Sequence, residues 1–165
     1  MSVFYPDITF ASAYELSAEK LTEKGIKGVI FDIDNTLVPY SVHTCPEHTE
    51  KFLKGLEDAG LAVGYVSNNH SERVELFNGG KRFFVPDAKK PSKRGAVLFA
   101  EHFGISAKEL AVVGDQIFTD ILFAKNAGAY SILVRPIDTS CEPWYFIFKR
   151  PIEKIILFFY RRKHK

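Results

Sequence analysis

The chain has 165 residues, a formal net charge of +2, 46% hydrophobic residues and 25% charged residues. These values are ordinary for a folded protein and exclude a disordered acidic chain, a collagen-like fibre and a small disulfide-stapled domain. The length predicts a single domain over 1–165. The charge is uneven, because residues 149–165 hold seven Lys and Arg against one Glu, which gives this segment +6 and the rest of the chain −4.

The cysteine content and the N-terminus indicate a cytoplasmic protein. Cys45 and Cys141 lie far apart, without neighbours at a metal-binding spacing. A reduced setting inside the cell is the simpler interpretation, and a single disulfide is the alternative. We expect no signal peptide and no membrane-spanning helix, because the sequence lacks a basic N-terminal region before a long apolar run and lacks any run of roughly 18 apolar residues.

Short apolar runs alternate with amphipathic stretches along most of the chain. A lead-in over residues 1–27 contains a predicted helix at 17–25, residues 136–150 are predicted to be irregular, and a last helix over 151–160 is predicted to begin at Pro151. Between them we predict strands at 28–33, 61–67, 82–88, 109–115 and 130–136, and helices at 46–60, 71–80, 92–104 and 117–128. This alternation predicts βαβ units, right-handed crossovers and a mainly parallel sheet.

Two aspartates stand at the end of the first predicted strand, in the sequence Asp32-Ile33-Asp34-Asn35-Thr36. Carboxylates at the end of a buried strand are costly unless a cation or hydrogen bonds satisfy them. Side chains two residues apart share a face of a strand, so an extended backbone brings Asp32 and Asp34 together. Such a pair suits a hard cation such as Mg²⁺, or a nucleophile with an acid/base partner. Turn chemistry is the alternative, and for Asn35 alone it is the preferred interpretation.

Polar groups also follow three later strands. Each group alone has an ordinary explanation as a helix cap, a solvated basic loop or a favourable charge at a helix N-terminus. Together they are more specific, because the carboxyl ends of parallel strands meet at one edge of the sheet, where ligands bind. The groups are Ser67 at the end of 61–67 with Asn68 next to it, Lys90 after 82–88, and Asp115 at the end of 109–115 with Asp120 beyond it.

The segments FDIDNTLV, VSNN, AKKP and VGDQIFTD, in this order, resemble the four motifs of the haloacid dehalogenase (HAD) superfamily of Mg²⁺-dependent phosphatases. The longer segments GIKGVIFDIDNTLVPY and GDQIFTDILFAKNAG, with PDITFASAYEL before them and RPIEKIIL after them, are similar to the YqeG-type branch of HAD subfamily IIIA. That branch is similar to the phosphatidylglycerophosphate phosphatases. The resemblance implies a three-layer α/β/α sandwich with a mainly parallel, Rossmann-like sheet and a catalytic core over about 27–136.

The resemblance also implies a mechanism. The implied activity is Mg²⁺-dependent hydrolysis of a phosphomonoester through an aspartyl phosphate formed on Asp32, and Asp34 is the implied acid and base. Mg²⁺ is the implied cofactor. Its implied ligands are Asp32, Asp34 through its main-chain carbonyl, and Asp115.

The remaining matching residues have supporting roles in the same family pattern. Ser67 and Asn68 are implied to bind phosphoryl oxygens, and Lys90 is implied to neutralise the anionic cluster. Two lysines precede Pro91, so Lys89 and Lys93 remain alternates for Lys90. The implied supporting residues are Thr36 and Asp120.

The spacing of the motifs leaves no room for an inserted cap domain. About ten residues separate Thr36 from Pro46, and about twenty separate Ser67 from Lys90. We therefore expect an open site that takes a large substrate or one presented by a surface. The C-terminal segment, about 143–165, mixes aromatic and aliphatic residues with Lys and Arg, a combination that suits an anionic membrane interface. Packing of this segment on the sheet and a dimer interface are the alternatives.

The resemblance to the YqeG-type branch, together with the missing cap and the C-terminal segment, implies phosphatidylglycerophosphate as the substrate and phosphatidylglycerol as the product. The protein is then expected to make peripheral contact with the inner face of the membrane through residues 149–165. A phosphatase for a soluble phosphomonoester and a non-catalytic binding protein with the HAD fold are the alternatives. We expect no nucleic acid partner, because the positive charge is confined to the C-terminal segment. The oligomeric state is left open.

Overall fold

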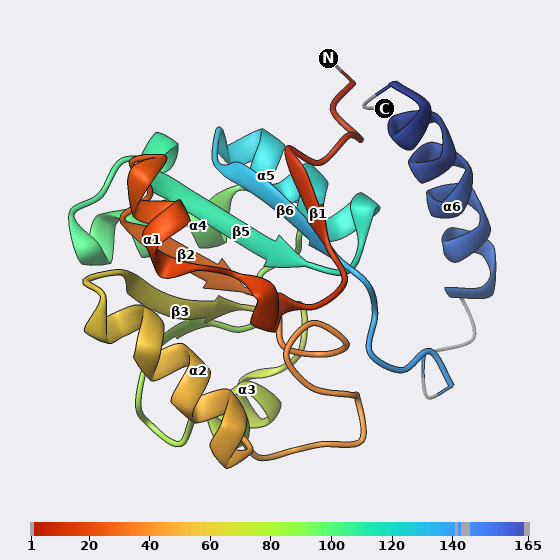
Figure 1. The fold of residues 1–165 in the computed structure, drawn as a ribbon. Helices are drawn as coiled ribbons and strands as arrows, with labels where there is room; N and C mark the ends of the chain where they lie inside the picture. Colours follow the sequence, from red (N-terminus) through yellow and green to blue (C-terminus); the bar gives the residue numbers. More distant parts are fainter. Residues whose placement is uncertain (1, 141, 143–145, 164–165) are drawn as a thin grey trace.

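In the part of the chain that the computed structural model describes, residues 2–140, 142 and 146–163, six parallel strands form one sheet (Figure 1). Their spatial order is β1-β6-β5-β2-β3-β4. The chain therefore builds outward from β2 in two directions, first through β3 and β4 and then through β5 and β6. The strands are β1 Ile8–Phe10, β2 Gly28–Phe31, β3 Ala62–Val66, β4 Phe83–Val85, β5 Leu110–Gly114 and β6 Tyr130–Val134.

Helices cover both faces of the sheet, so the predicted three-layer sandwich is confirmed (Figure 1). Along β2, Val29 and Phe31 point to the face covered by α1, α2 and α3, whereas Ile30 points to the face covered by α4 and α5. The whole of β2 is buried, which explains its continuous apolar sequence. The helices are α1 Ala18–Glu23, α2 Glu47–Asp58, α3 Ser71–Asn78, α4 Arg94–Phe103, α5 Leu122–Ala127 and α6 Phe146–Lys163.

The prediction for residues 1–27 is incomplete, because this lead-in holds an edge strand as well as a helix. The strand β1 pairs in parallel with β6, with Ile8 opposite Ile132. Asp7 fixes the pairing, because its carboxylate accepts hydrogen bonds from the backbone N–H and the hydroxyl of Ser131 at 2.8 and 2.7 Å. Three residues are too few to show the alternation of a strand in sequence.

The prediction for the C-terminal region is wrong in its boundary. Helix α6 begins at Phe146, within the segment predicted to be irregular, and Pro151 lies inside the helix. One side of α6 packs on the sheet edge, where Ile156 and Leu157 contact a small cluster around Leu133, and Tyr160 stacks edge-on against Tyr5. Cys141 and, in the predicted C-terminal segment, residues 143–145 and 164–165 lie outside the described part of the chain.

No inserted cap domain is present in the described residues, in agreement with the motif spacing. A loop joins β2 to α2, and α3 is the one helix between β3 and β4. Within the described residues, no helix is both long enough and apolar enough to cross a membrane. The carboxyl ends of the central strands are therefore left without an inserted domain above them.

Candidate active site

Three buried aspartates come together beyond the carboxyl ends of β2 and β5. Asp32 directly follows β2 and Asp115 directly follows β5, and these two strands are hydrogen-bonded neighbours. Asp120 reaches the same place from a π-helical turn, Ile117–Ile121. Each of the three offers a carboxylate oxygen within 4.8 Å of the others. They meet where the strand order changes direction, which is where open α/β sheets bind their ligands.

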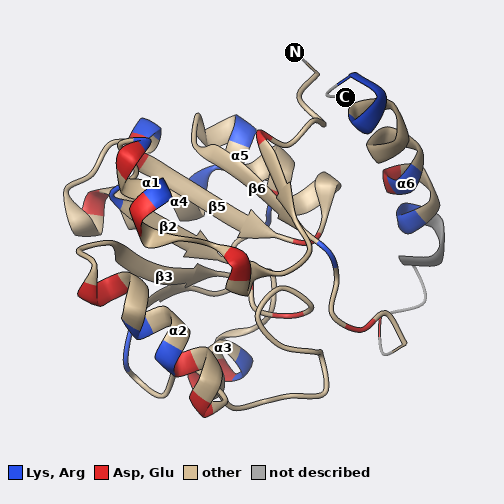
Figure 2. Ribbon diagram, viewed as in Figure 1, with Lys and Arg blue, Asp and Glu red and all other residues tan. Residues whose placement is uncertain are grey.

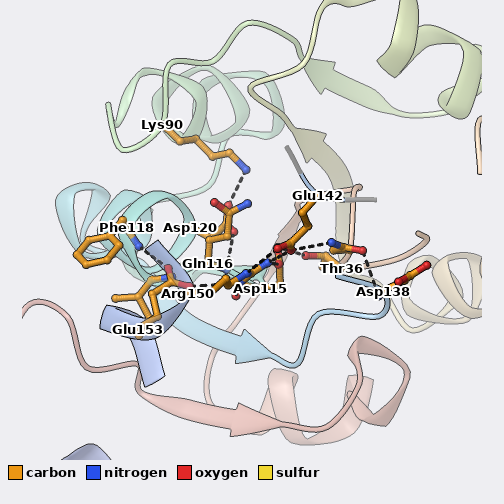
Figure 3. A network of polar contacts seen from close by, with 12 residues as sticks. Thr36, Lys90, Asp115, Gln116, Phe118, Asp120, Asp138, Glu142, Arg150 and Glu153 are labelled. Carbon is orange, nitrogen blue, oxygen red and sulfur yellow. Dashed lines mark hydrogen bonds and ion pairs between the residues drawn. The ribbon is translucent and has the colours of Figure 1, made fainter. Parts of the chain in front are cut away.

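Gly114, the last residue of β5, permits Asp120 to approach the strand this closely. A Cβ atom at position 114 would lie 2.2 Å from Asp120 Cγ, which is nearer than real Cβ atoms come to other atoms. With no side chain at 114, Asp120 turns back and accepts a hydrogen bond from Gln116 N at 3.1 Å (Figure 3). The glycine before Asp115 is therefore part of how the acidic group is assembled.

Lys90 is the cation that faces this acidic group. Its Nζ donates to Asp32 Oδ1 and to Asp120 Oδ1, each at 2.6 Å, and its side chain is 3% exposed. Lys89 and Lys93 are both exposed. Of the three lysines considered in sequence, Lys90 is thus the one that the structure brings against Asp32.

Carboxylates outnumber the cations at this place, and their pKa values reflect it. Burial raises the pKa of Asp32 well above its usual range, and Asp120 and Asp115 add to the effect while Lys90 opposes it. Burial and the Asp120 carboxylate also raise the pKa of Asp115 to about 7. Burial alone would lower the pKa of Lys90, but Asp120 and Asp32 outweigh burial and raise it. A divalent cation among the three carboxylates would remove the repulsion between them.

Asp34 points away from the acidic group and toward α3. Arg73 Nη2 donates to Asp34 Oδ1 at 2.7 Å, and Asn69 Nδ2 donates to Asp34 Oδ2 at 2.5 Å. Arg73 also donates to the carbonyl oxygens of Val42 and His43 at 2.8 and 3.1 Å, so it connects α3 to the loop after β2. The two aspartates of the first motif therefore have different partners, and both oxygens of Asp34 are held in a fixed orientation.

Ser67 and Asn68 follow β3 and lie beside Lys90. Ser67 Oγ accepts a hydrogen bond from Asn69 N at 3.1 Å. Asn68 bonds to the backbone of Lys90 in both directions, with Lys90 N donating to Asn68 Oδ1 at 2.7 Å and Asn68 Nδ2 donating to Lys90 O at 3.3 Å. Asn68 thus positions the lysine segment, in addition to facing the pocket. Thr36 Oγ1 donates to Asp115 Oδ1 at 3.4 Å and so lies behind the acidic group.

A small polar pocket of about 140 Å³ opens above Asp32. Its volume is below the roughly 300–1,000 Å³ of typical small-molecule pockets, so it suits one compact group such as a phosphoryl group. The structure therefore gathers Asp32, Asp34 and Lys90 around one opening, with Asp115 and Asp120 beneath it. The pocket is lined by Asp32, Asp34, Tyr40, Ser67, Asn68, Asn69, Lys90, Gln116, Thr119 and Lys149.

Helix α6 supplies a second cation, Arg150, to the acidic group (Figure 3). Its guanidinium donates to a carboxylate oxygen of Asp115 and to the main-chain oxygen of the same residue, the latter at 2.9 Å. It also pairs with Glu142, and with Glu153 at 3.2 Å. Glu153 in turn accepts hydrogen bonds from Ile117 N and Phe118 N at 2.7 and 3.3 Å, at the start of the π-helical turn. The C-terminal helix is therefore attached to the site itself.

Sequence reasoning missed these contributions. Arg73 sits in a short helix with no motif around it, and its partner Asp34 is far away in the chain. Arg150 belongs to the basic C-terminal run, for which the sequence predicts contact with a membrane, whereas the structure holds its side chain 14% exposed against Asp115. Asn69 is adjacent to two predicted residues, so the second motif gave the one local signal that could have found it.

Comparison with known proteins shows which family the chain belongs to. The family model described as mitochondrial PGP phosphatase matches residues 1–137. The chain belongs to this family. It is 31% identical over 161 residues to a Bacillus subtilis protein named "Probable phosphatase YqeG", with 97% of this chain and 93% of that protein covered. The resemblance to HAD phosphatases of the YqeG and PGP phosphatase type is thus confirmed, and the family member described here is a phosphatase.

A plant relative and a solved structure complete the comparison. The chain is 29% identical over 169 residues to phosphatidylglycerophosphate phosphatase 1 of Arabidopsis thaliana, covering 96% of this chain and 48% of that protein. It therefore spans about half the length of this relative. The cobalt-bound deoxy-D-mannose-octulosonate 8-phosphate phosphatase of Haemophilus influenzae superposes with a TM-score of 0.53 at 21% identity, covering 79% of this chain and 77% of that one. This similarity shows that the HAD-like fold is shared.

Proposed function

We propose that this phosphatase is a cytoplasmic, Mg²⁺-dependent phosphomonoester hydrolase that acts through an aspartyl phosphate on Asp32. The observation that carries the proposal is the buried group in which Lys90 bridges Asp32 and Asp120 at 2.6 Å beneath a small polar pocket. A carboxylate that attacks a phosphate dianion is repelled by its like charge, so nearby cations must reduce this repulsion. Lys90 provides one such cation at the oxygen of Asp32 itself.

The donor set suits Mg²⁺. Carboxylate oxygens are the ligands that Mg²⁺ prefers, and those of Asp32, Asp115 and Asp120 lie within 4.8 Å of one another. We assign Asp32, Asp115 and the main-chain carbonyl of Asp34 as the ligands, with Asp120 and Thr36 in support. When bound, Mg²⁺ supplies a Lewis acid that withdraws charge from the phosphoryl oxygens.

The residues of the chain divide the reaction into two displacements. Asp32 attacks phosphorus in the first, while Ser67, Asn68 and Lys90 hold the phosphoryl oxygens. Asp34 gives a proton to the leaving oxygen and then takes a proton from the water that hydrolyses the aspartyl phosphate. The contacts of Asp34 with Arg73 and Asn69 hold its carboxylate at the mouth of the pocket, where the leaving group departs.

The substrate that we propose is phosphatidylglycerophosphate. The Arabidopsis relative carries that substrate in its name, and the described residues contain no cap over the site. In mixed micelles with Mg²⁺, the purified protein is expected to release phosphate from phosphatidylglycerophosphate with a kcat/KM at least about 100-fold above that for p-nitrophenyl phosphate or glycerol 3-phosphate, because remote binding energy is used in the transition state. EDTA is expected to abolish phosphate release from all three compounds.

Two results would contradict this proposal at different levels. Equal or higher kcat/KM for glycerol 3-phosphate would favour a soluble substrate over the lipid. Absence of phosphate release from every phosphomonoester by Mg²⁺-loaded protein would favour a binding protein that keeps the fold without turnover.

We also propose that α6 contacts an anionic membrane. Its outer side exposes Ile152, Ile155, Phe158 and Phe159 at 51–57%, and basic residues recur along the helix (Figure 2). The double variant I155S/F159S is expected to bind vesicles of phosphatidylcholine with phosphatidylglycerol at least about tenfold more weakly in co-sedimentation. The control L76S/V97S removes two exposed apolar side chains from α3 and α4 and is expected to bind as the wild type does. Equal losses in both double variants would exclude α6 as the contact.

A further inference from the structure

A second cavity, much larger than the acidic pocket, lies beside it under α6. Its volume is about 630 Å³, which is within the range of roughly 300–1,000 Å³ that ligand pockets occupy. The floor is made by the β1 and β6 edge of the sheet and the wall by α6. Asp115 is the one lining residue of this cavity that the proposed chemistry uses; we call the cavity the α6 cleft.

The α6 cleft has an apolar interior. Phe10 at the end of β1, Leu133 in β6 and Leu157 in α6 line it from three different elements. Leu133 is also part of the small cluster on which α6 packs, so the cleft is the open continuation of a packed interface. An apolar chain that entered here would bury its surface against all three elements.

The rim of the α6 cleft carries basic side chains that form no ion pair within the described part of the chain. Arg135, Lys154 and Arg161 line the cleft and are exposed, and none of the three forms an ion pair within the described residues. Lys154 and Arg161 lie seven residues apart, on the same side of α6 as Leu157. This rim is therefore suited to an anionic group that would neutralise it.

Two of the three acidic residues that line the same cleft are paired with Arg150. Glu153 accepts from Ile117 N and pairs with Arg150, and Asp115 pairs with Arg150 as well. Glu15 accepts a hydrogen bond from Ala11 N at 3.4 Å. Glu15 is exposed and forms no ion pair within the described residues, so the unpaired charges of the cleft are three basic side chains against one carboxylate. The balance is positive, and the apolar surface lies next to it.

One helix borders both sites. Lys149 lines the acidic pocket, whereas Lys154, Leu157 and Arg161 line the α6 cleft. Arg150, between them in sequence, lines the cleft and contacts Asp115. A molecule with a phosphomonoester at one end and an apolar chain at the other can therefore be held along α6.

We infer that the α6 cleft binds the diacylglycerol phosphodiester part of a lipid substrate, with one acyl chain against Phe10, Leu133 and Leu157 and the phosphodiester at Lys154 and Arg161. This inference rests on the proposed function and adds a second subsite to it. The cleft then serves in place of a cap, because it selects the part of the substrate that does not react.

Direct binding tests the inference without catalysis. Dihexanoyl-phosphatidylglycerol below its critical micelle concentration serves as the probe, measured by isothermal titration calorimetry on the full chain. The wild type is expected to bind it, and the variant K154Q/R161Q is expected to bind about tenfold more weakly, since two charge-assisted contacts are lost. The control R162Q/K163Q removes the same charge from the same helix outside the cleft and is expected to bind within about twofold of the wild type.

A second probe separates the lipid from its headgroup. Glycerophosphoglycerol carries the same phosphodiester without acyl chains and is expected to bind at least about tenfold more weakly than the lipid. The inference is overturned if the wild type does not bind the lipid, if both double variants bind it equally, or if the two probes bind with equal affinity. Absent phosphate release from p-nitrophenyl phosphate on the same preparation would instead contradict the proposed function, so the two failures are distinguishable.

Discussion

Replacing Asp32 with Asn is expected to lower kcat for p-nitrophenyl phosphate on the order of 10⁴-fold, with the protein still folded. The carboxamide is isosteric with the carboxylate but is too weak a nucleophile to form the acyl phosphate. The change also removes one carboxylate from a buried group in which Asp115 and Asp120 already repel it, so the melting temperature is expected to stay the same or to rise. Phosphate release and thermal unfolding measure the two effects.

The matched control is Asp58→Asn in α2. Asp58 is an exposed aspartate that pairs with Lys54 at the surface, so its replacement is expected to change neither kcat nor the melting temperature measurably. Residual activity above about one tenth of the wild type in D32N would contradict the role of Asp32 as nucleophile. Collapse of the melting temperature in D32N would show that its loss of activity reports unfolding.

Replacing Lys90 with Met is expected to destabilise the protein by about 3–5 kcal/mol, because it leaves Asp32 and Asp120 buried without their shared cation. Activity is expected to fall as well, since the attack of Asp32 loses its screening charge. Mg²⁺ is expected to restore part of the lost stability, as a cation that binds the folded state shifts the unfolding equilibrium. Urea unfolding with and without Mg²⁺ measures both quantities.

Lys93→Met is the control for that variant. Lys93 is three residues further along and exposed, so its replacement is expected to change stability by no more than about 0.5 kcal/mol. Equal effects of the two substitutions would contradict the assignment of Lys90 to the third motif. Loss of stability in K90M that Mg²⁺ leaves unchanged would contradict the placement of the metal among these carboxylates.

The central strands and the site at their ends could be predicted from sequence because both depend on local signals. A short apolar run such as 28–33 is typical of a buried strand or of part of a buried helix, and its length favours the strand. Asp32 and Asp115 follow such runs directly, so a parallel sheet was enough to bring them together. The roles of the surrounding cations were harder to predict, because Arg73 and Arg150 contact residues that lie far away in the sequence.

The start of α6 shows how a local signal fails. Proline is favoured at the first position of a helix, because the N–H groups there lack partners. Pro151 therefore gave a plausible start, but Arg150 and the preceding residues are helical. The ion pairs of Arg150 with Asp115 and Glu142 fix that turn through tertiary contacts, and such contacts override propensity.

The pairing of β1 with β6 has a consequence for how the chain folds. Asp7 and Ser131 are hydrogen-bonded although 124 residues separate them. Closing a loop of that length lowers the entropy of the chain before any stabilising contact has formed, so such pairings form slowly. During synthesis, the first strand has no neighbour to join until β6 has left the ribosome. The edge of the sheet that bears the α6 cleft is therefore the last part of the molecule to be completed.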